Sequence, residues 1–125
     1  MRLEFNANLV GVEREFAVTA GFAVEAGGKL QEQILISRSL PDVEVIPGIE
    51  GVCTVRGEQR YVLYGGITRA SLTSDSLSLC FTEAASTQLG GVTELVAYYP
   101  ANHVSELNDA LAFIFQGCGC YEHRT

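Results

Sequence analysis

Alternation between apolar and polar residues runs through most of this chain, and it limits the folds that the chain can adopt. Leu3, Phe5, Ala7 and Leu9 alternate with polar neighbours. Successive side chains of a strand point to opposite faces of a sheet, so this spacing predicts one opening strand with a single buried face. Comparable patterns lie at residues 16–24, 33–39, 52–56, 60–64, 67–73, 77–82 and 92–99. The chain is therefore predicted to be rich in β-structure.

Two segments show helical spacing instead. Thr82 is suited to cap the start of a short helix near residues 83–89, which the following glycine pair would end. A longer C-terminal helix is predicted near residues 103–116, because apolar residues recur there every three or four positions, with Asn102 as its cap. We therefore predict an α+β fold, in which a mainly antiparallel sheet of seven or eight strands packs with these helices.

Glycine and proline mark the connections between these elements. Gly65 and Gly66 separate two predicted hairpins, where glycine permits a bend or a close approach of the backbone. No G-x-G-x-x-G pattern is present, so the pair is interpreted as a bend and not as a phosphate-binding loop. Pro41 and Pro47 frame a less regular passage, and we predict a surface loop there because proline lacks the N–H that a strand ladder requires.

The length and the terminal residues bound the organisation of the chain. A length of 125 residues is usual for one domain, and we assign residues 1–117 to a single α+β domain and residues 118–125 to a flexible tail. The first residues lack the apolar block of a secretory signal, and no apolar run approaches the roughly 20 residues that cross a bilayer. We expect a cytoplasmic protein outside the membrane. The sequence leaves a monomer and a homodimer both open.

Charge is distributed unevenly along the chain. Eight Lys and Arg residues against fifteen Asp and Glu residues give a net charge of −7, which opposes binding to the phosphates of nucleic acid. Residues 70–123 contain no Lys or Arg. Two interpretations remain open: these acidic residues keep the protein soluble, or they form a face that steers a basic partner. The candidates for such a partner-binding face are Asp75, Glu83, Glu94, Glu106 and Asp109.

The sequence contains no recognisable catalytic set. Hydrolysis requires a nucleophile, a base and an orienting group, yet the chain has only His103 and His123, and neither stands in a known motif. His103 precedes the predicted C-terminal helix and is interpreted as part of the helix entry, with a small enzyme centred on it as an alternative. We predict that the protein is not an enzyme and that it requires no cofactor.

The cysteines suggest one further chemistry. Cys53 and Cys80 lie inside predicted strands and are interpreted as small buried residues. Cys118, Cys120 and His123 bring two thiols and an imidazole into one short stretch, and zinc accepts these ligands. Structural zinc sites usually have four ligands in two separated pairs, so we assign no metal site and keep these three residues as weak candidates. A small metal-binding or redox protein using this tail is the alternative function.

Five short pieces of the sequence occur in a characteristic order. They are Leu3 to Val12, Ile34 to Ser39, Tyr64 to Ile67, Thr82 to Ala85 followed by Leu89 and Gly90, and Ile114 to Gly117. Each piece is common by itself, whereas their order and spacing resemble the immunity protein ten family of bacterial polymorphic toxin systems. The resemblance covers residues 1–117.

This resemblance implies a function without turnover. A member of the family is expected to bind the toxin domain encoded beside it and to neutralise that toxin by stoichiometric occlusion, which protects the producing cell or its kin. Toxins that attack nucleic acid are often basic, so an anionic inhibitor would gain a fast association rate. The expected partner is therefore a cognate toxin domain, and a basic one fits the charge.

Overall fold

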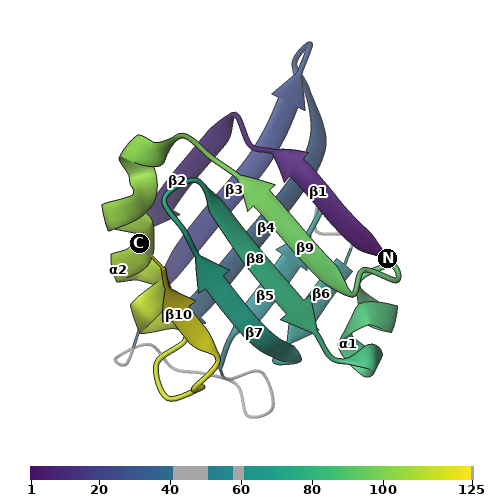
Figure 1. Cartoon of the computed structure of the whole chain (residues 1–125), viewed down its shortest axis with the longest axis vertical. Helices are drawn as coiled ribbons and strands as arrows, with labels where there is room; N and C mark the ends of the chain where they lie inside the picture. Colours follow the sequence, from purple (N-terminus) through teal and green to yellow (C-terminus); the bar gives the residue numbers. More distant parts are fainter. Residues whose placement is uncertain (41–50, 58–60, 125) are drawn as a thin grey trace.

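The computed structural model describes residues 1–40, 51–57 and 61–124 (Figure 1). The described strands form two sheets of five strands each. Sheet A has the order β1 (Arg2–Asn6), β9 (Glu94–Tyr98), β8 (Ser76–Phe81), β7 (Ile67–Leu72) and β10 (Tyr121–His123). Sheet B has the order β2 (Leu9–Glu13), β3 (Ala17–Ala26), β4 (Lys29–Ser39), β5 (Cys53–Arg56) and β6 (Tyr61–Tyr64). The helices are α1 (Glu83–Gln88), the 3-10 turn η1 (Ala101–His103) and α2 (Val104–Ile114).

The two sheets pack face to face around one hydrophobic core. Sheet A lies in front of sheet B in Figure 1, and α1 and α2 lie at opposite sides of the molecule. Phe22 of sheet B, Leu79 of sheet A and Leu111 of α2 are each 0% exposed within this core. The predicted α+β class is confirmed in this broad sense. The prediction of one sheet with seven or eight strands is wrong.

The opening strand predicted from alternation is divided between the sheets. The N–H of Ala7 donates to the carbonyl of Tyr98 in sheet A (2.8 Å), whereas the N–H of the next residue, Asn8, donates to the carbonyl of Ala23 in sheet B (2.9 Å). The apolar alternation continues through this corner but the buried face does not, because Ala7 is buried between the sheets whereas Leu9, the first residue of β2, is exposed. Period-two patterning alone therefore does not reveal the change of sheet.

Sheet A is a mixed sheet, because both of its edge strands pair in parallel. β1 pairs with β9, and β10 pairs with β7, while the three central strands are antiparallel. β10 corrects the expectation of a flexible tail over residues 118–125, since Tyr121, Glu122 and His123 lie in register with residues 70–72. The surface loop predicted around Pro41 and Pro47 lies outside the described residues.

Gly65 and Gly66 lead the chain from sheet B into sheet A, as the predicted bend between two hairpins requires. Both have left-handed backbone conformations, with φ of 75° and 80°. A Cβ atom on Gly66 would lie 2.6 Å from the Cβ of Ala85, whereas one on Gly65 would meet nothing within 4 Å. Gly66 is therefore the point where α1 rests directly on the backbone.

The helix starts agree only partly with prediction. The N–H of Ala85 donates to the hydroxyl of Thr82 (3.1 Å), which confirms Thr82 as the cap of α1. Asn102 was expected to cap the last helix, but it lies within η1. The N-cap position of α2 belongs to His103, whose side chain makes no capping hydrogen bond. The preceding 3-10 turn continues into α2 and replaces a side-chain cap.

Two arginines of sheet B bind the C-terminal ends of the two helices. Arg38 donates through Nη1 to the carbonyls of Ile114 (3.3 Å) and Gln116 (2.6 Å) at the end of α2. Arg56 donates through Nη1 to the carbonyl of Leu89 (2.7 Å), which follows α1. The last carbonyls of a helix lack intrahelical partners and attract positive charge, so each arginine joins one helix to the sheet.

Candidate partner interface

The acidic residues proposed as a partner-binding face fall into two groups. Asp75 lies in the β7–β8 turn, and its carbonyl accepts from the N–H of Tyr99, just before η1 and α2. Glu106 and Asp109 are exposed on α2. Glu83 begins α1, and Glu94 begins β9 at the other side of the molecule. The structure therefore does not bring all five candidates together.

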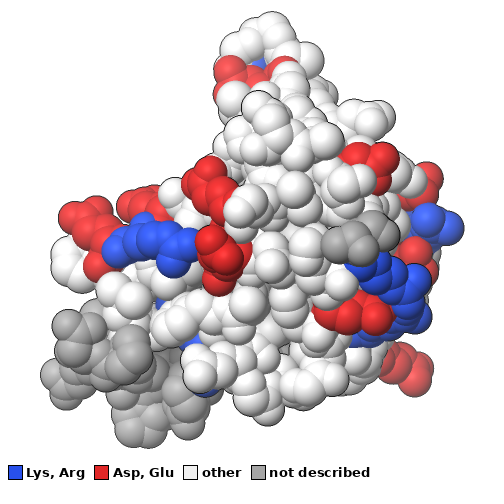
Figure 2. Space-filling view, turned by 60° about the vertical axis from the view of Figure 1, so that its left-hand side comes forward, with Lys and Arg blue, Asp and Glu red and all other residues white. Residues whose placement is uncertain are grey.

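Basic residues from elsewhere neutralise part of this charge. Oε1 of Glu94 lies 3.2 Å from Nε of Arg2. Glu122 is paired with Arg124 (2.8 Å) and Arg69 (3.0 Å), and hydrogen bonds from these two arginines hold the pKa of Glu122 below its usual value. Figure 2 shows acidic groups in small separate clusters, several beside basic groups. The half of the sequence without Lys or Arg does not fold into one uninterrupted anionic face.

The weak metal candidates are not assembled into a metal site. Cys118 is exposed, Cys120 is half-buried, and His123 lies at the exposed end of β10. Among the described residues, no group of three or more His, Cys, Asp or Glu side chains is placed to hold a metal ion. His103, the residue of the alternative enzyme hypothesis, is half-buried at the junction of η1 and α2.

An uncharged surface that the sequence analysis did not single out covers the outer face of sheet B. Strand register places outward side chains in three cross-strand rows, which together define this face. The rows are Leu9–Ala23–Gln33, Gly11–Gly21–Leu35–Val55–Val62, and Glu13–Thr19–Ser37–Cys53–Tyr64. Among the described residues of these rows, Glu13 at one corner is the only charged one.

Large apolar side chains on this face are open to solvent. Leu9 is 50% exposed, Val62 is 44% exposed and Tyr64 is 46% exposed. A shallow depression of about 340 Å³ lies over β2, β3 and β4 on this face, where Gly11 and Gly21 face each other across β2 and β3. No helix or strand in the described part of the chain covers this face, because α2 packs its buried side chains into the core.

The outer face of sheet A has the opposite composition. Its cross-strand rows consist mostly of charged and hydroxyl-bearing side chains, with Val96 and Cys80 among them. The charged members are Arg2, Glu4, Arg69, Glu94 and Glu122. The two sheets therefore share one core but present different chemistry to solvent, and only sheet B offers an apolar outer face.

A signal for this face is present in the sequence. The segments 17–24 and 61–64 contain no charged residue on either side of the alternation. A strand with one wet face usually places charged or strongly polar residues at every second position. Their absence therefore indicates a second apolar face on these strands.

The comparisons with known proteins identify the family. The family model described as Immunity protein 10 matches residues 6–105. The chain belongs to the Immunity protein 10 family. The resemblance drawn from the five pieces is thus confirmed, and no curated protein matches the chain.

The Immunity protein 10 match includes every residue that makes up the outer face of sheet B. It ends at Ser105, near the start of α2, so Cys118 and Cys120 lie outside it. In the described residues, no helix is long and apolar enough to cross a bilayer. Membership implies an immunity protein with a toxin as partner.

Proposed function

We propose that this protein binds a cognate bacterial toxin domain stoichiometrically and blocks its action in the cytoplasm, without catalysing a reaction. The observation that carries the proposal is membership of the Immunity protein 10 family. We further propose that the toxin docks on the outer face of sheet B, where apolar side chains surround the Gly11–Gly21 depression. The partner contributes a largely uncharged, apolar contact surface.

The composition of this face supports the choice. The centres of protein interfaces are depleted in charge and enriched in tyrosine and other aromatic residues, and their rims are polar. Strands about 4.8 Å apart give the five-stranded face a width of roughly 20 Å, enough for the buried centre of a contact. Leu9 and Val62 lie on its two edge strands, and Glu13 lies at its border. The middle row of the face, from Gly11 to Val62, is apolar from one edge strand to the other, and the row beside it contributes the polar residues Glu13, Thr19 and Ser37.

The acidic residues have a separate role in this proposal. Asp75, Glu106 and Asp109 form no ion pair with any described residue, and two of them are exposed on α2. Their field attracts a basic toxin from a distance and raises the association rate, as does that of Glu83. Glu94 contributes less, because Arg2 compensates its charge.

The docking face is tested with substitutions at exposed positions, which leave the core intact. Leu9→Arg and Val62→Arg should each weaken binding of the toxin encoded by the neighbouring gene by about 100-fold, because an arginine would be buried without a partner. Tyr98→Arg is the matched control, since Tyr98 is 37% exposed on the outer face of sheet A. Affinity is measured by calorimetry, and neutralisation by growth during toxin expression.

Each outcome has a distinct meaning. No binding by the unmodified protein to any adjacent toxin rejects the proposed function. Binding that Tyr98→Arg weakens as much as Val62→Arg does rejects the docking face but keeps the function. A dimeric protein that Val62→Arg makes monomeric, with toxin binding unchanged, would assign the face to a second copy of this chain. In stopped-flow mixing with the toxin, Glu106→Lys with Asp109→Lys should slow association of a basic toxin; unchanged rates would reject steering.

A further inference from the structure

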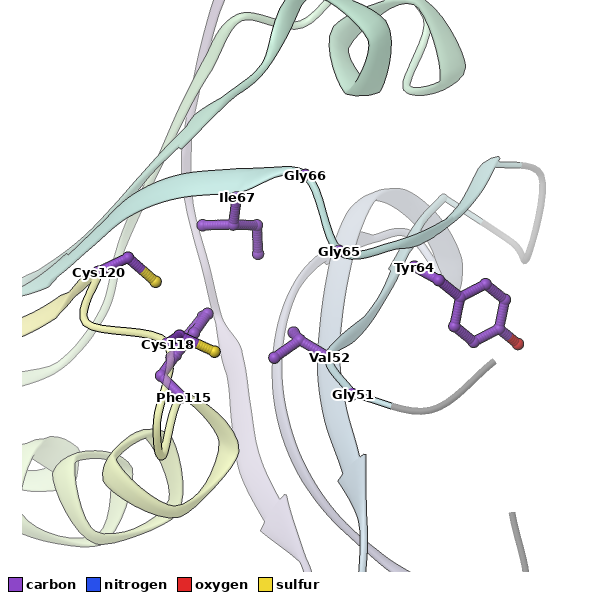
Figure 3. A pocket seen from close by; sticks show the side chains of 9 residues that line it. All are labelled: Gly51, Val52, Tyr64, Gly65, Gly66, Ile67, Phe115, Cys118 and Cys120. Atoms are coloured by element: carbon purple, nitrogen blue, oxygen red, sulfur yellow. The ribbon is translucent and has the colours of Figure 1, made fainter. Parts of the chain in front are cut away.

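A pocket of about 360 Å³ lies where the chain passes from sheet B to sheet A (Figure 3). Its walls include Val52, Ile67 and Phe115 together with the backbone of the glycine pair. The sulfur atoms of Cys118 and Cys120 both point into it. Two of the four thiols of the chain therefore share one partly apolar cavity, which meets the outer face of sheet B at Tyr64.

The backbone holds these two cysteines close together. The N–H of Cys118 donates to the carbonyl of Phe115 (3.0 Å), and the carbonyl of Cys120 accepts from the N–H of Ala70 (2.8 Å). Gly119 between them is left-handed, with φ of 70°. Consecutive Cα atoms are 3.8 Å apart, so a bend at Gly119 brings the Cα atoms of its neighbours into the range of about 4.4–6.8 Å that a disulfide spans.

The two thiols differ in their access to solvent. Cys118 is exposed, whereas Cys120 is half-buried. Burial is the main cause that raises the pKa of Cys120, and the adjacent Cys118 thiol raises it further. Cys118 is therefore the thiol that meets a dissolved reagent first, and Cys120 is placed to react with Cys118 afterwards.

We propose that Cys118 and Cys120 form a reversible disulfide by exchange with a small dissolved disulfide. The Cys118 thiolate attacks one sulfur of that disulfide, which forms a mixed disulfide and releases the first small thiolate. The Cys120 thiolate then attacks Sγ of Cys118, forms the Cys118–Cys120 bond and releases the second thiolate. Two cysteine thiols are oxidised, one small disulfide is reduced to two thiols, and the two protons lost by the cysteines end on the two released small thiolates.

The other two cysteines do not share this arrangement. Cys53 lies on the outer face of sheet B opposite Tyr64, and Cys80 lies on the outer face of sheet A opposite Glu94 and Arg69. The core separates these two faces, so they are too far apart to bridge. Both are replaced by serine in the test, so that only the thiols of Cys118 and Cys120 remain to be counted.

The test uses the reduced full chain and oxidised glutathione as the probe. After incubation with oxidised glutathione, the double variant Cys53→Ser with Cys80→Ser should have no free thiol and no bound glutathione. Maleimide labelling counts the free thiols, and intact mass detects bound glutathione. Adding Cys120→Ser to this background should leave one glutathione on Cys118, because the resolving thiol is missing. Dithiothreitol should restore every thiol.

Contrary results are equally specific. Two glutathiones on the double variant would show that the thiols react independently, and two unmodified thiols would show that neither reacts; both overturn the proposal. A disulfide that forms only in denaturant would also overturn it, because the folded geometry would then have no part. The amide of Ala70 provides a local signal, since its exchange with deuterium should change on oxidation where the Cys120 carbonyl accepts its bond.

Discussion

At the scale of single residues, Gly66 is the described glycine that tolerates an added side chain least. Its positive φ already disfavours other residues, and the Cβ of Ala85 occupies the space where a side chain would begin. Gly65 shares the backbone conformation but not the contact. Substitution of Gly65 therefore tests the strain of the left-handed backbone alone, whereas substitution of Gly66 tests that strain together with the clash against Ala85.

Gly66→Ala should lower the free energy of unfolding by about 3 kcal/mol, since it combines left-handed strain with overpacking against α1. Gly65→Ala should cost only about 1 kcal/mol, because only the strain applies. Urea unfolding followed by circular dichroism measures both values. Equal losses for the two variants would show that α1 moves away freely.

At the scale of elements, the two helices depend on sheet B for their C-terminal ends. Arg38 lies in β4 and Arg56 lies in β5, yet each donates to carbonyls near the end of a helix that follows much later in the chain. Arg56 also lies 3.3 Å from Glu32 and over the ring of Tyr61. The arginines thus fix the helices across the molecule, where their macrodipoles favour positive charge.

Removing the charge at residue 38 should release the last turn of α2. Arg38→Gln is expected to cost about 1–2 kcal/mol, because it loses charge-assisted hydrogen bonds to Ile114 and Gln116. Hydrogen exchange should accelerate in the last turn of α2 and remain unchanged in α1. Arg14→Gln, at an exposed position between strands, is the control. Uniform acceleration in both helices would contradict a local cap.

Prediction from sequence succeeded where the signal was local. The alternation located most strands, and Thr82 located α1, because a cap and its first turn lie within four residues. The division into two sheets depends on partners far along the chain, which alternation does not encode. β10 was missed because three residues are too few to show a period, and its parallel partner lies some fifty residues earlier. The exposed apolar face of sheet B was not predicted, because alternation was used to locate buried side chains and not to examine the composition of the opposite face.

At the scale of the whole molecule, the ionisation of two tyrosines makes the free energy of unfolding depend on pH in the alkaline range. Tyr99 packs 5.9 Å from Phe22 between ring centroids, and its hydroxyl donates to the carbonyl of Thr73. Tyr121 stacks on Phe115, and its hydroxyl donates to Asn108 (2.7 Å). Burial is the main cause that raises the pKa of Tyr99 and of Tyr121 to about 12.

These tyrosines should destabilise the fold between pH 10 and 12. Unfolded tyrosine ionises near pH 10, so in this window the folded state keeps protons that the unfolded state has released, and the free energy of unfolding falls as pH rises. The stabilising contribution is complete below pH 10. Tyr99→Phe should flatten this fall, and Tyr99→Phe with Tyr121→Phe should flatten it further, measured by urea titration at each pH. An unchanged slope would contradict the assignment.

The division of the chain between its sheets sets an order of assembly during synthesis. Sheet B takes its five strands, β2 to β6, in consecutive chain order, whereas sheet A joins β1 to β9 and also includes β10, the last described strand. Joining distant segments carries a larger entropic cost than joining neighbours. Sheet B can therefore form while the ribosome is still adding residues. Sheet A must wait for residue 123, so the proposed docking strands emerge well before the protein is finished.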